Sequence, residues 1–350
     1  MADKLTPTDP RVQHRTFTVP NTSKTYHYLL AEPPSGTAPV ATCLLIHGFP
    51  DLSFGWRCQI PHLAGALSLR VIAPDLPGYG GSSAPAELSA YSFKSVVDDL
   101  ASLVRHVLGP DAEGEGEKIV LGGHDWGGAV AWRFALWRPD LLRCVFSVCT
   151  PYWPPSPVYL PKEEVVKRLP NFGYQLQWEG HEVERAAAGK EGIRGFLNIC
   201  YGARGKNGEA PLFDPTKGVR LDLVERGMVG ESPLMSKEEM DFYVEEYARK
   251  GMKWPLNWYR TDKVNFEEEV ELVKAERFRI KTPALMVTAS ADQALPPTMA
   301  AAMDEYCDDL VTREVNASHW VLWEKPAEVN AHISEFLERF LKEGPLKASI

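Results

Sequence analysis

The first 150 residues alternate between continuous apolar runs and segments whose apolar residues have helical spacing. The run APVATCLLIHG (38–48) is apolar almost throughout and ends at a glycine, which is typical of a parallel strand buried on both faces. Shorter apolar runs elsewhere in this region have the same character. Strands are therefore predicted at 26–32, 38–48, the start of 68–82, 118–123 and 143–150.

Two helices are predicted between these strands. Residues 92–109 carry apolar side chains three or four positions apart, and Gly109 marks the end of the segment. Residues 126–140 form a second helical segment, which Pro139 ends. Strands that alternate with helices at this spacing imply βαβ crossovers and a mostly parallel sheet with helices on both faces. The predicted fold class is therefore α/β.

The alternation stops after Thr150. From there the chain is rich in Pro, Gly and aromatic residues, and no buried strand is predicted until IKTPALMVTAS (280–290). A further strand at 310–316 and an amphipathic helix that opens at Pro326 follow. The late return of the strand pattern indicates that the strands of one sheet are separated in the sequence by a long segment without buried strands.

We therefore predict a single α/β domain with a helical insertion. Residues 1–150 form the first part of the domain, 151–270 the insertion and 271–350 the second part. An insertion at this point lies over the carboxyl ends of the strands, where open α/β sheets bind ligands. The insertion is therefore expected to act as a lid.

Composition and charge exclude several classes of protein. With 350 residues, 44% of them apolar, the chain can bury a large core. Its net charge of −9 argues against nucleic acid or an anionic membrane as a partner. It has neither an apolar run at its start nor a stretch of about 18 apolar residues, so a cytoplasmic protein is expected. Six cysteines without a CxxC pair predict reduced core thiols, and neither a metal nor a cofactor is expected.

The stretch GGHDWGG (122–128) lies where a predicted strand meets a predicted helix. Gly123 and Gly127 flank Asp125 at the two positions where a side chain would collide with the adjoining strand or helix. The helix N-terminus favours an ionised carboxylate at this point. An acidic helix cap is the simpler interpretation of an Asp before a helix. The two glycines favour a nucleophile elbow instead.

Seven motifs extend this pattern over nearly the whole chain. They are HGFPD, DLPGYGGS, GGHDWGG, YQLQ, PLNWYR, TASAD and ASHW, in this order. In these motifs the chain resembles the α/β-hydrolase fold family and, within it, the epoxide hydrolases with an aspartate nucleophile. The resemblance implies the α/β-hydrolase fold, with a mostly parallel central sheet, helices on both faces and a helical lid.

An aspartate at the elbow indicates the type of reaction. A carboxylate can displace a leaving group at a saturated carbon, which gives an alkyl ester. A water activated by a histidine then attacks the ester carbonyl and regenerates Asp125. The resemblance implies that His319 is this base and that Asp292 is its acid partner, because the fold uses the order nucleophile, acid, base. Two other histidines near the motifs, His124 and His47, are expected to be structural.

The oxyanion hole needs two backbone donors, which the resemblance places at Phe49 and Trp126. The side chains of these residues and of Trp320 are expected to line the substrate pocket. The sequence leaves open whether the peptide bond before Pro50 is cis. Asp75 and the glycines after it are interpreted as turn formers without a chemical role.

Two tyrosines of the insertion bear on the identity of the substrate. Opening an epoxide requires a neutral acid at the ring oxygen, and a tyrosine with a pKa near ~10 stays protonated at pH 7. Tyr174 in NFGYQLQW and Tyr259 in GMKWPLNWYR match the two lid tyrosines of the epoxide hydrolases. The expected reaction is therefore the hydrolysis of an epoxide to a vicinal diol, with water as co-substrate.

Two alternatives remain at this point. A haloalkane dehalogenase also has an elbow aspartate followed by Trp, but it holds the halide with a side-chain N–H at the position of Phe49, whose phenyl ring cannot donate. A non-catalytic ligand receptor on the same fold need not keep the acid, the base and both tyrosines. An insertion rich in Trp, Phe, Leu and Met favours an apolar substrate, either a lipid-derived or an aryl epoxide. The sequence predicts no oligomeric state.

Overall fold

A computed structural model describes residues 3–109 and 117–341 of the chain. Its central element is an eight-stranded sheet in the order β1-β2-β4-β3-β5-β6-β9-β10. The pairs β1–β2 and β2–β4 are antiparallel and the other pairs are parallel, so the predicted mostly parallel sheet is confirmed. The strands are β1 (Gln13–Thr18), β2 (Thr25–Ala31), β3 (Ala41–Ile46), β4 (Leu69–Pro74), β5 (Ile119–His124), β6 (Leu142–Val148), β9 (Ala284–Ala289) and β10 (Leu310–Val315).

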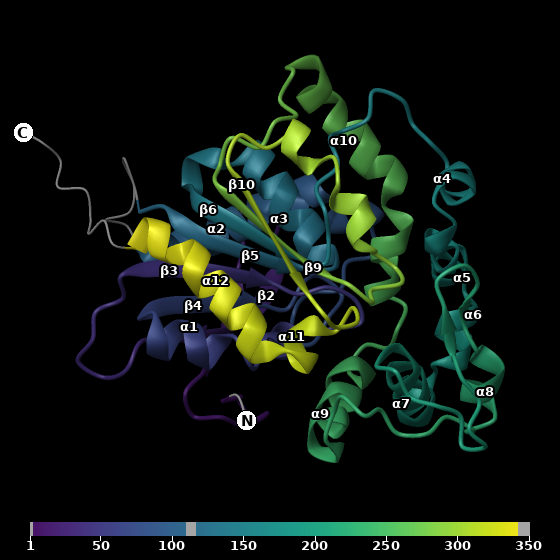
Figure 1. Cartoon of the computed structure of the whole chain (residues 1–350). Helices are drawn as coiled ribbons and strands as arrows, with labels where there is room; N and C mark the ends of the chain where they lie inside the picture. Colours follow the sequence, from purple (N-terminus) through teal and green to yellow (C-terminus); the bar gives the residue numbers. More distant parts are fainter. Residues whose placement is uncertain (1–2, 110–116, 342–350) are drawn as a thin grey trace, which may run out of the picture.

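Helices cover both faces of this sheet (Figure 1). The helices α1 and α12 pack on one face, and α2 and α3 pack on the other. Together with the short helix α11 they are α1 (Ile60–Ala66), α2 (Phe93–Leu108), α3 (Trp126–Trp137), α11 (Val321–Glu324) and α12 (Pro326–Leu341). The helices that the sequence predicts at 92–109, at 126–140 and from Pro326 correspond to α2, α3 and α12. The α2 boundaries follow from local chemistry, because the Ser92 side chain accepts a hydrogen bond from the Ser95 amide and Gly109 takes a positive φ of 85°.

The strands at the centre of the sheet are buried along their whole length. All six residues of β3, of β5 and of β9 are buried. Continuous apolar runs are what a parallel strand between two helical layers requires, because both of its faces contact side chains. The same runs therefore serve as the core and as the rigid support for the loops at the strand ends.

Strand β1 was not predicted from the sequence. Its residues QHRTFT are almost all exposed, so the strand lacks the apolar positions on which the prediction rested. It forms because its backbone pairs with β2 along the edge of the sheet, from Gln13 opposite Leu30 to Thr18 opposite Thr25. Pairing of this kind leaves little trace in a pattern of apolar residues.

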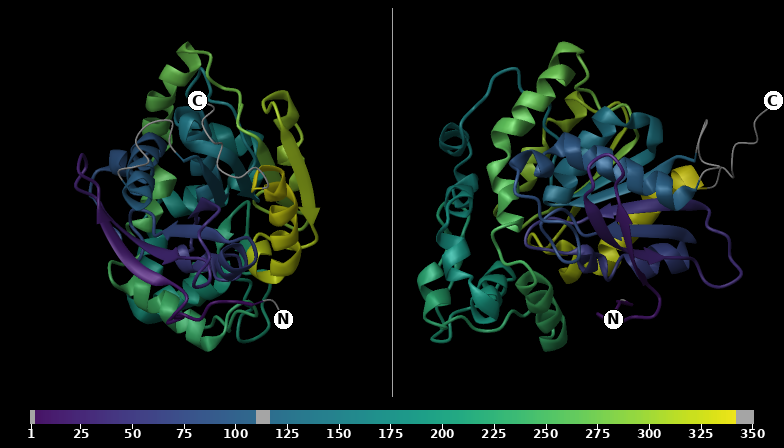
Figure 2. Two further views of the ribbon diagram at one scale, coloured as in Figure 1. Left: turned by 90° about the vertical axis from the view of Figure 1, so that its left-hand side faces the viewer. Right: turned by 180° about the vertical axis from the view of Figure 1, so that it is seen from behind.

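The segment between β6 and β9 is mainly helical, and the name "insertion" is used below for its residues 151–270. Its helices are α4 (Lys162–Arg168), α5 (Tyr174–Glu179), α6 (Glu182–Ala186), α7 (Gly189–Cys200), α8 (Leu221–Glu225) and α9 (Lys237–Ala248), with a 3-10 segment, η6, at Pro255–Arg260. A last helix, α10 (Asp262–Lys274), begins in the insertion and continues past residue 270. A small hairpin, β7 (Phe213–Asp214) and β8 (Gly218–Val219), lies among them. Helices α4 to α9 stand beside one end of the sheet domain (Figure 1 and the right-hand view of Figure 2).

Two further features concern the chain as a whole. Among the helices that the structure describes, none is long and apolar enough to cross a membrane. All six cysteines are unpaired, and five of them are buried.

Candidate active site

Asp125 stands at a sharp turn between β5 and α3. Its φ of 53° lies in the left-handed region, which is strained for a residue with a side chain. The turn is possible because its neighbours are glycines: a Cβ on Gly123 would lie 2.2 Å from the Gly127 carbonyl oxygen, and one on Gly127 would lie 2.0 Å from that of Ile46. Thr150 adds a restraint, because its hydroxyl donates to the Asp125 carbonyl oxygen at 2.7 Å. The elbow thus presents the Asp125 carboxylate at the carboxyl end of the sheet.

The two oxygens of this carboxylate face different groups. Oδ1 accepts a hydrogen bond of 2.7 Å from the backbone amide of Phe49, which precedes a cis peptide bond to Pro50. Oδ2 lies 3.5 Å from Nε2 of His319. The amide of Trp126, expected as a second donor, makes no hydrogen bond to this carboxylate within the described part of the chain. Phe49 is therefore the donor that already contacts the nucleophile candidate.

His319 and Asp292 form a hydrogen-bonded pair behind Asp125. Nδ1 of His319 lies 2.7 Å from Oδ2 of Asp292, whose other oxygen accepts bonds of 2.9 Å from the amides of Ala294 and Leu295. Burial raises the pKa of Asp292, but the His319 charge and hydrogen bonds lower it below its usual value. Burial lowers the pKa of His319, but Asp292 and the bond to Asp125 raise it well above the ordinary value. The imidazole is thus held with Nε2 towards Asp125.

Tyr174 and Tyr259 come together from separate parts of the insertion. Tyr174 is the first residue of α5, Tyr259 lies in η6, and their ring centroids are 6.2 Å apart. Both side chains are buried, and both line the same cavity as Asp125. Burial, followed by the negative charge of Asp125, raises the pKa of Tyr174, and burial raises that of Tyr259 well above its usual range. Both phenols are therefore neutral at pH 7 and can donate a hydrogen bond or a proton.

The cavity over Asp125 has a volume of about 360 Å³. Its walls are mainly aromatic and aliphatic, and the insertion supplies Trp178, Leu212, Phe213 and Leu234. Phe49 and Trp320, two of the residues expected at the pocket, also line it. Trp126 does not belong to the lining; its ring packs edge-on against Tyr259 at 5.2 Å. An apolar cavity of this size with a few polar groups at one end is typical of a small-molecule site.

Two histidines near the site hold backbone groups. His124 is fully buried, and its Nε2 lies 2.9 Å from the carbonyl oxygen of His319. Burial, and then the His319 charge, lower the pKa of His124 to about 4, so its imidazole is neutral at pH 7. In the loop after β3, Nε2 of His47 accepts from the Leu76 amide and its Nδ1 donates to the Gly48 carbonyl oxygen. These contacts fix the loops that carry Phe49 and His319.

Sequence reasoning missed the side chains that hold the loop after Phe49. Tyr201 donates to the Pro50 carbonyl oxygen, Tyr243 to Oδ1 of Asp51 at 2.6 Å, and Tyr247 to the Asp51 carbonyl oxygen at 3.1 Å. Burial raises the pKa of Asp51 to about 7, although the Tyr243 bond opposes the shift. With twelve tyrosines in the chain, no local pattern singled these three out.

One group of side chains brings three potential metal ligands together among the described residues. Ligand atoms of His124, Cys149 and His319 lie within 4.8 Å of one another. Most of these groups already have partners, however: His319 contacts two carboxylates, and both Nε2 of His124 and Sγ of Cys149 contact the His319 carbonyl oxygen. Nδ1 of His124 is buried without a hydrogen-bond partner among the described residues. A metal bound to His319 would compete with one of these two carboxylates for a ring nitrogen.

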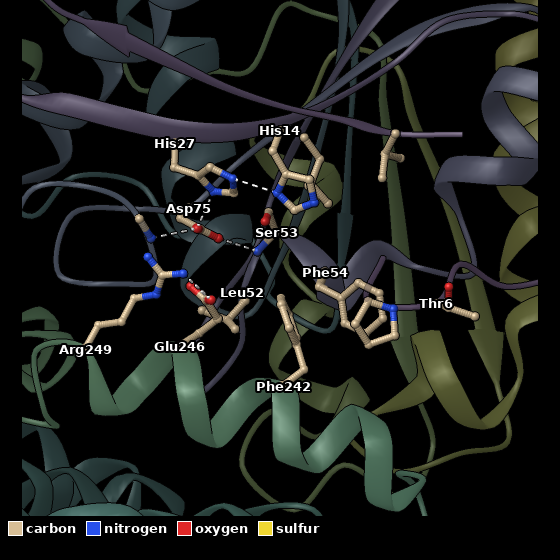
Figure 3. A pocket seen from close by; sticks show the side chains of 14 residues that line it. Thr6, His14, His27, Leu52, Ser53, Phe54, Asp75, Phe242, Glu246 and Arg249 are labelled. Carbon is tan, nitrogen blue, oxygen red and sulfur yellow. Dashed lines mark hydrogen bonds and ion pairs between the residues drawn. The ribbon is translucent and has the colours of Figure 1, made fainter. Parts of the chain in front are cut away.

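A second, smaller cavity lies between the N-terminal segment, the edge strands and helix α9 (Figure 3). Its volume is about 120 Å³, and it shares no lining residue with the cavity over Asp125. Here His14, His27 and Asp75 lie in a row, with distances of 3.0 Å and 2.7 Å between successive polar atoms. Asp75 also accepts bonds from the amides of Ser53 and Gly81. It therefore ties together loops around the site and does not contact the Asp125 cavity.

Comparisons with known proteins agree with this geometry. A model of the alpha/beta hydrolase family matches residues 43–332. Epoxide hydrolase srdG of Neurospora crassa is 47% identical over 347 residues, which cover 97% of this chain and 99% of that protein. Bifunctional epoxide hydrolase 2 of Rattus norvegicus is 34% identical over 90% of the chain, which spans only 54% of that longer protein. The crystal structure of epoxide hydrolase A from Mycobacterium thermoresistibile superposes with a TM-score of 0.76 at 28% identity, covering 93% of this chain and 98% of the other.

Proposed function

Because the chain belongs to the alpha/beta hydrolase family and, within it, to the epoxide hydrolases, we propose that the site around Asp125 converts epoxides to vicinal diols through a covalent intermediate. The proposal is supported chiefly by the arrangement of the Asp125 carboxylate. One of its oxygens accepts from the Phe49 amide, the other lies 3.5 Å from Nε2 of His319, and Asp125 lines the cavity. Two neutral tyrosines from the insertion line the same cavity.

In the first step Oδ2 of Asp125 attacks a ring carbon of the epoxide. A carbon–oxygen bond forms to Asp125 while the bond from the same carbon to the ring oxygen breaks. An alkoxide is a poor leaving group, so the ring oxygen takes a proton from Tyr174 or Tyr259 as it leaves. The product of this step is a hydroxyalkyl ester of Asp125 and one tyrosinate.

In the second step a water molecule hydrolyses the ester. Nε2 of His319 removes a proton from the water, whose oxygen attacks Cγ of Asp125, and Asp292 stabilises the resulting imidazolium. The negative charge of the tetrahedral intermediate develops on Oδ1, which the Phe49 amide already contacts. Collapse of the intermediate releases the diol with a proton from His319. The proton left over from the water returns to the tyrosinate, so the net reaction is epoxide plus water to diol.

The insertion acts as a lid in this proposal, because it supplies both acids and most of the apolar wall. That wall favours an apolar epoxide, lipid-derived or aryl, of a size that a cavity of about 360 Å³ can hold. The dehalogenase alternative finds no support at Phe49, whose side chain offers no N–H to a halide. The cytoplasmic location expected from the sequence stays a prediction.

A single turnover in heavy-oxygen water tests the mechanism. With enzyme in excess over an aryl epoxide, the diol of the first turnover should carry no label, and mass spectrometry of the peptide that contains Asp125 should show one heavy oxygen. Direct attack of water on the epoxide would place the label in the first diol and none in the peptide. That outcome would rule out the covalent intermediate.

A further inference from the structure

We propose that Lys162, the first residue of α4, is a positioning residue that sets the spacing of the two acid tyrosines. The inference rests on the proposed function, since it assumes that Tyr174 and Tyr259 protonate the epoxide oxygen. Lys162 belongs to none of the motifs that carry the family resemblance, and its side chain does not line the cavity. It would act through the tyrosines and would not touch the substrate.

The Lys162 side chain is buried, with only 6% of its surface exposed, and its ammonium group has three partners. Nζ donates a short hydrogen bond to the backbone carbonyl oxygen of Tyr259. It also forms ion pairs with Oε2 of Glu179 at 3.1 Å and Oδ2 of Asp262 at 2.9 Å. A lysine is seldom buried unless it is paired, because removing its charge from water is costly. Here the partners fill the three donor positions of the ammonium group.

The partners lie on the elements that carry the tyrosines. Tyr259 itself is one of them, and Asp262 opens α10 directly after η6. Glu179 is the last residue of α5, the helix whose first residue is Tyr174. The rise of an α-helix places these two residues only about 7.5 Å apart along the axis. One ammonium group therefore links the backbone of one tyrosine to the far end of the short helix that carries the other.

A second cation supports the same junction without contacting Tyr259 through its side chain. Arg260 donates to the carbonyl oxygens of Glu179 at 2.9 Å and Gly180 at 2.8 Å, and it forms an ion pair with Glu184. These contacts hold η6 against α5 even without Lys162. Removing Lys162 should therefore shift Tyr259 without unfolding the insertion. The carboxylates of Glu179 and Asp262 would then repel each other across the gap, and both are exposed enough to be hydrated.

The signature of such a role is an effect on one chemical step only. The tyrosines act when the ring opens, whereas ester hydrolysis depends on His319, Asp292 and the Phe49 amide, which lie outside the insertion. A displacement of a catalytic group by about 1 Å can slow a reaction by up to about 100-fold. A purely structural lysine would instead change stability, or slow both steps alike.

The test measures the two steps separately in Lys162→Met. Rapid-quench single turnovers, with mass spectrometry of the intact protein, give the rates at which the alkyl-enzyme forms and decays. Formation should slow by about 10- to 100-fold, with decay changed by less than about two-fold. Lys162→Arg, which keeps the charge, should recover part of the formation rate. Lys167→Met on the same helix is the matched control, because Lys167 is exposed and pairs with Glu164 of its own helix.

Equal slowing of both steps, or an unchanged rate of formation in a folded Lys162→Met protein, would overturn the proposal. If Lys162→Met does not fold, Glu179→Gln removes one ion pair and should show a weaker slowing of formation alone; its absence would count equally against the proposal. Tyr259→Phe separates the positioning role of Lys162 from the proposed catalytic role of Tyr259. Normal alkylation in Tyr259→Phe would remove the tyrosine from the mechanism, whereas slow alkylation there with a normal rate in Lys162→Met would reject only the role of Lys162.

Discussion

The imidazole of His319 lies between two carboxylates, 2.7 Å from Asp292 and 3.5 Å from Asp125. In the resting enzyme both contacts favour the charged ring, and they outweigh burial to raise the pKa of His319. A protonated histidine cannot act as a base. In the proposed mechanism Asp125 loses its charge when it is esterified, and its contribution to the raised pKa of His319 disappears. Formation of the ester thus converts His319 towards the neutral form that the second step needs.

A titration of His319 tests this coupling. We expect nitrogen NMR to show a pKa above the ordinary value of about 6.5 in the free enzyme. Asp292→Asn should lower it, because the Asp292 charge is the largest factor that raises it. The rate of ester hydrolysis, measured against pH in single turnovers, should fall on the acid side. The midpoint of that fall should lie at a lower pH than the pKa of His319 in the free enzyme. An acid limb at the same pH as the titration would contradict the coupling.

His319→Gln should separate the two halves of the reaction. Loss of a general base typically costs about 10²- to 10⁴-fold, so the ester should accumulate on Asp125. Intact-protein mass spectrometry should show an added mass equal to that of the epoxide. Asp125→Asn should show no such adduct in the same experiment. A His319→Gln protein that turns over without an adduct would assign the base to another residue.

At the scale of single elements, the β5–α3 elbow depends on missing side chains. The carbonyl oxygen of Ile46 lies where a Cβ of Gly127 would be, so the backbone of β3 and that of α3 are in direct contact. No flexible side chain is available there to move aside. The elbow is therefore the place where a single methyl group should do the most damage.

Gly127→Ala should lower the free energy of unfolding by about 1–3 kcal/mol, the usual cost of overpacking, and reduce the rate of alkylation. Thermal unfolding and single-turnover assays measure the two effects. Gly65→Ala is the control, because Gly65 is an exposed residue of α1 with no atom within 4 Å of its added Cβ. It should leave activity intact and stabilise the protein by about 0.5–1 kcal/mol. Equal stability of the two variants would show that the elbow can relax.

The sequence predicted elements well where apolar residues decide the structure. β3, β5 and α2 follow apolar patterns. The elbow follows from Gly123 and Gly127, because a side chain at either position would collide with nearby backbone. β1 was missed because backbone pairing with β2 holds it. Lys162 could not be found either, since its partners meet only when three segments of the insertion pack together. Contacts between residues far apart in sequence leave no periodic trace.

At the scale of the whole molecule, one arginine joins three parts of the chain. Arg57 follows the first 3-10 turn of the sheet domain, its guanidinium lies 4.3 Å from the ring centroid of Trp323 in α11, and its Nε donates to Glu239 of α9 at 2.8 Å. Lys4 of the N-terminal segment pairs with the same carboxylate. Burial raises the pKa of Glu239, but Arg57 and the other partners lower it overall, to about 2.

The ion pair between Arg57 and Glu239 should make the free energy of unfolding depend on pH in the acid range. The folded pKa of Glu239 lies below the ordinary value of 4.5, so the pair stabilises the protein fully above about pH 4.5 and loses its effect as the pH falls towards 2. Glu239→Gln should lower the free energy of unfolding at pH 7 by about 3 kcal/mol, since it leaves Arg57 buried without its carboxylate. Its urea midpoint should also fall less steeply between pH 4.5 and 2 than that of the unaltered protein. Parallel curves would show that Glu239 is not the titrating group.

The hydrogen bond from the Phe49 amide to Oδ1 of Asp125 gives the two oxygens of one carboxylate different lifetimes in the enzyme. In the proposed mechanism Oδ2 leaves with each diol and is replaced by the oxygen of a water, while Oδ1 keeps its place and survives many turnovers. The carboxylate can exchange the two only by rotating between turnovers, which requires that bond to break. In heavy-oxygen water the diol of the second turnover should therefore be almost fully labelled; if the carboxylate rotated freely, only half of it would be. The isotope content of that second product thus records how firmly one backbone amide holds its acceptor.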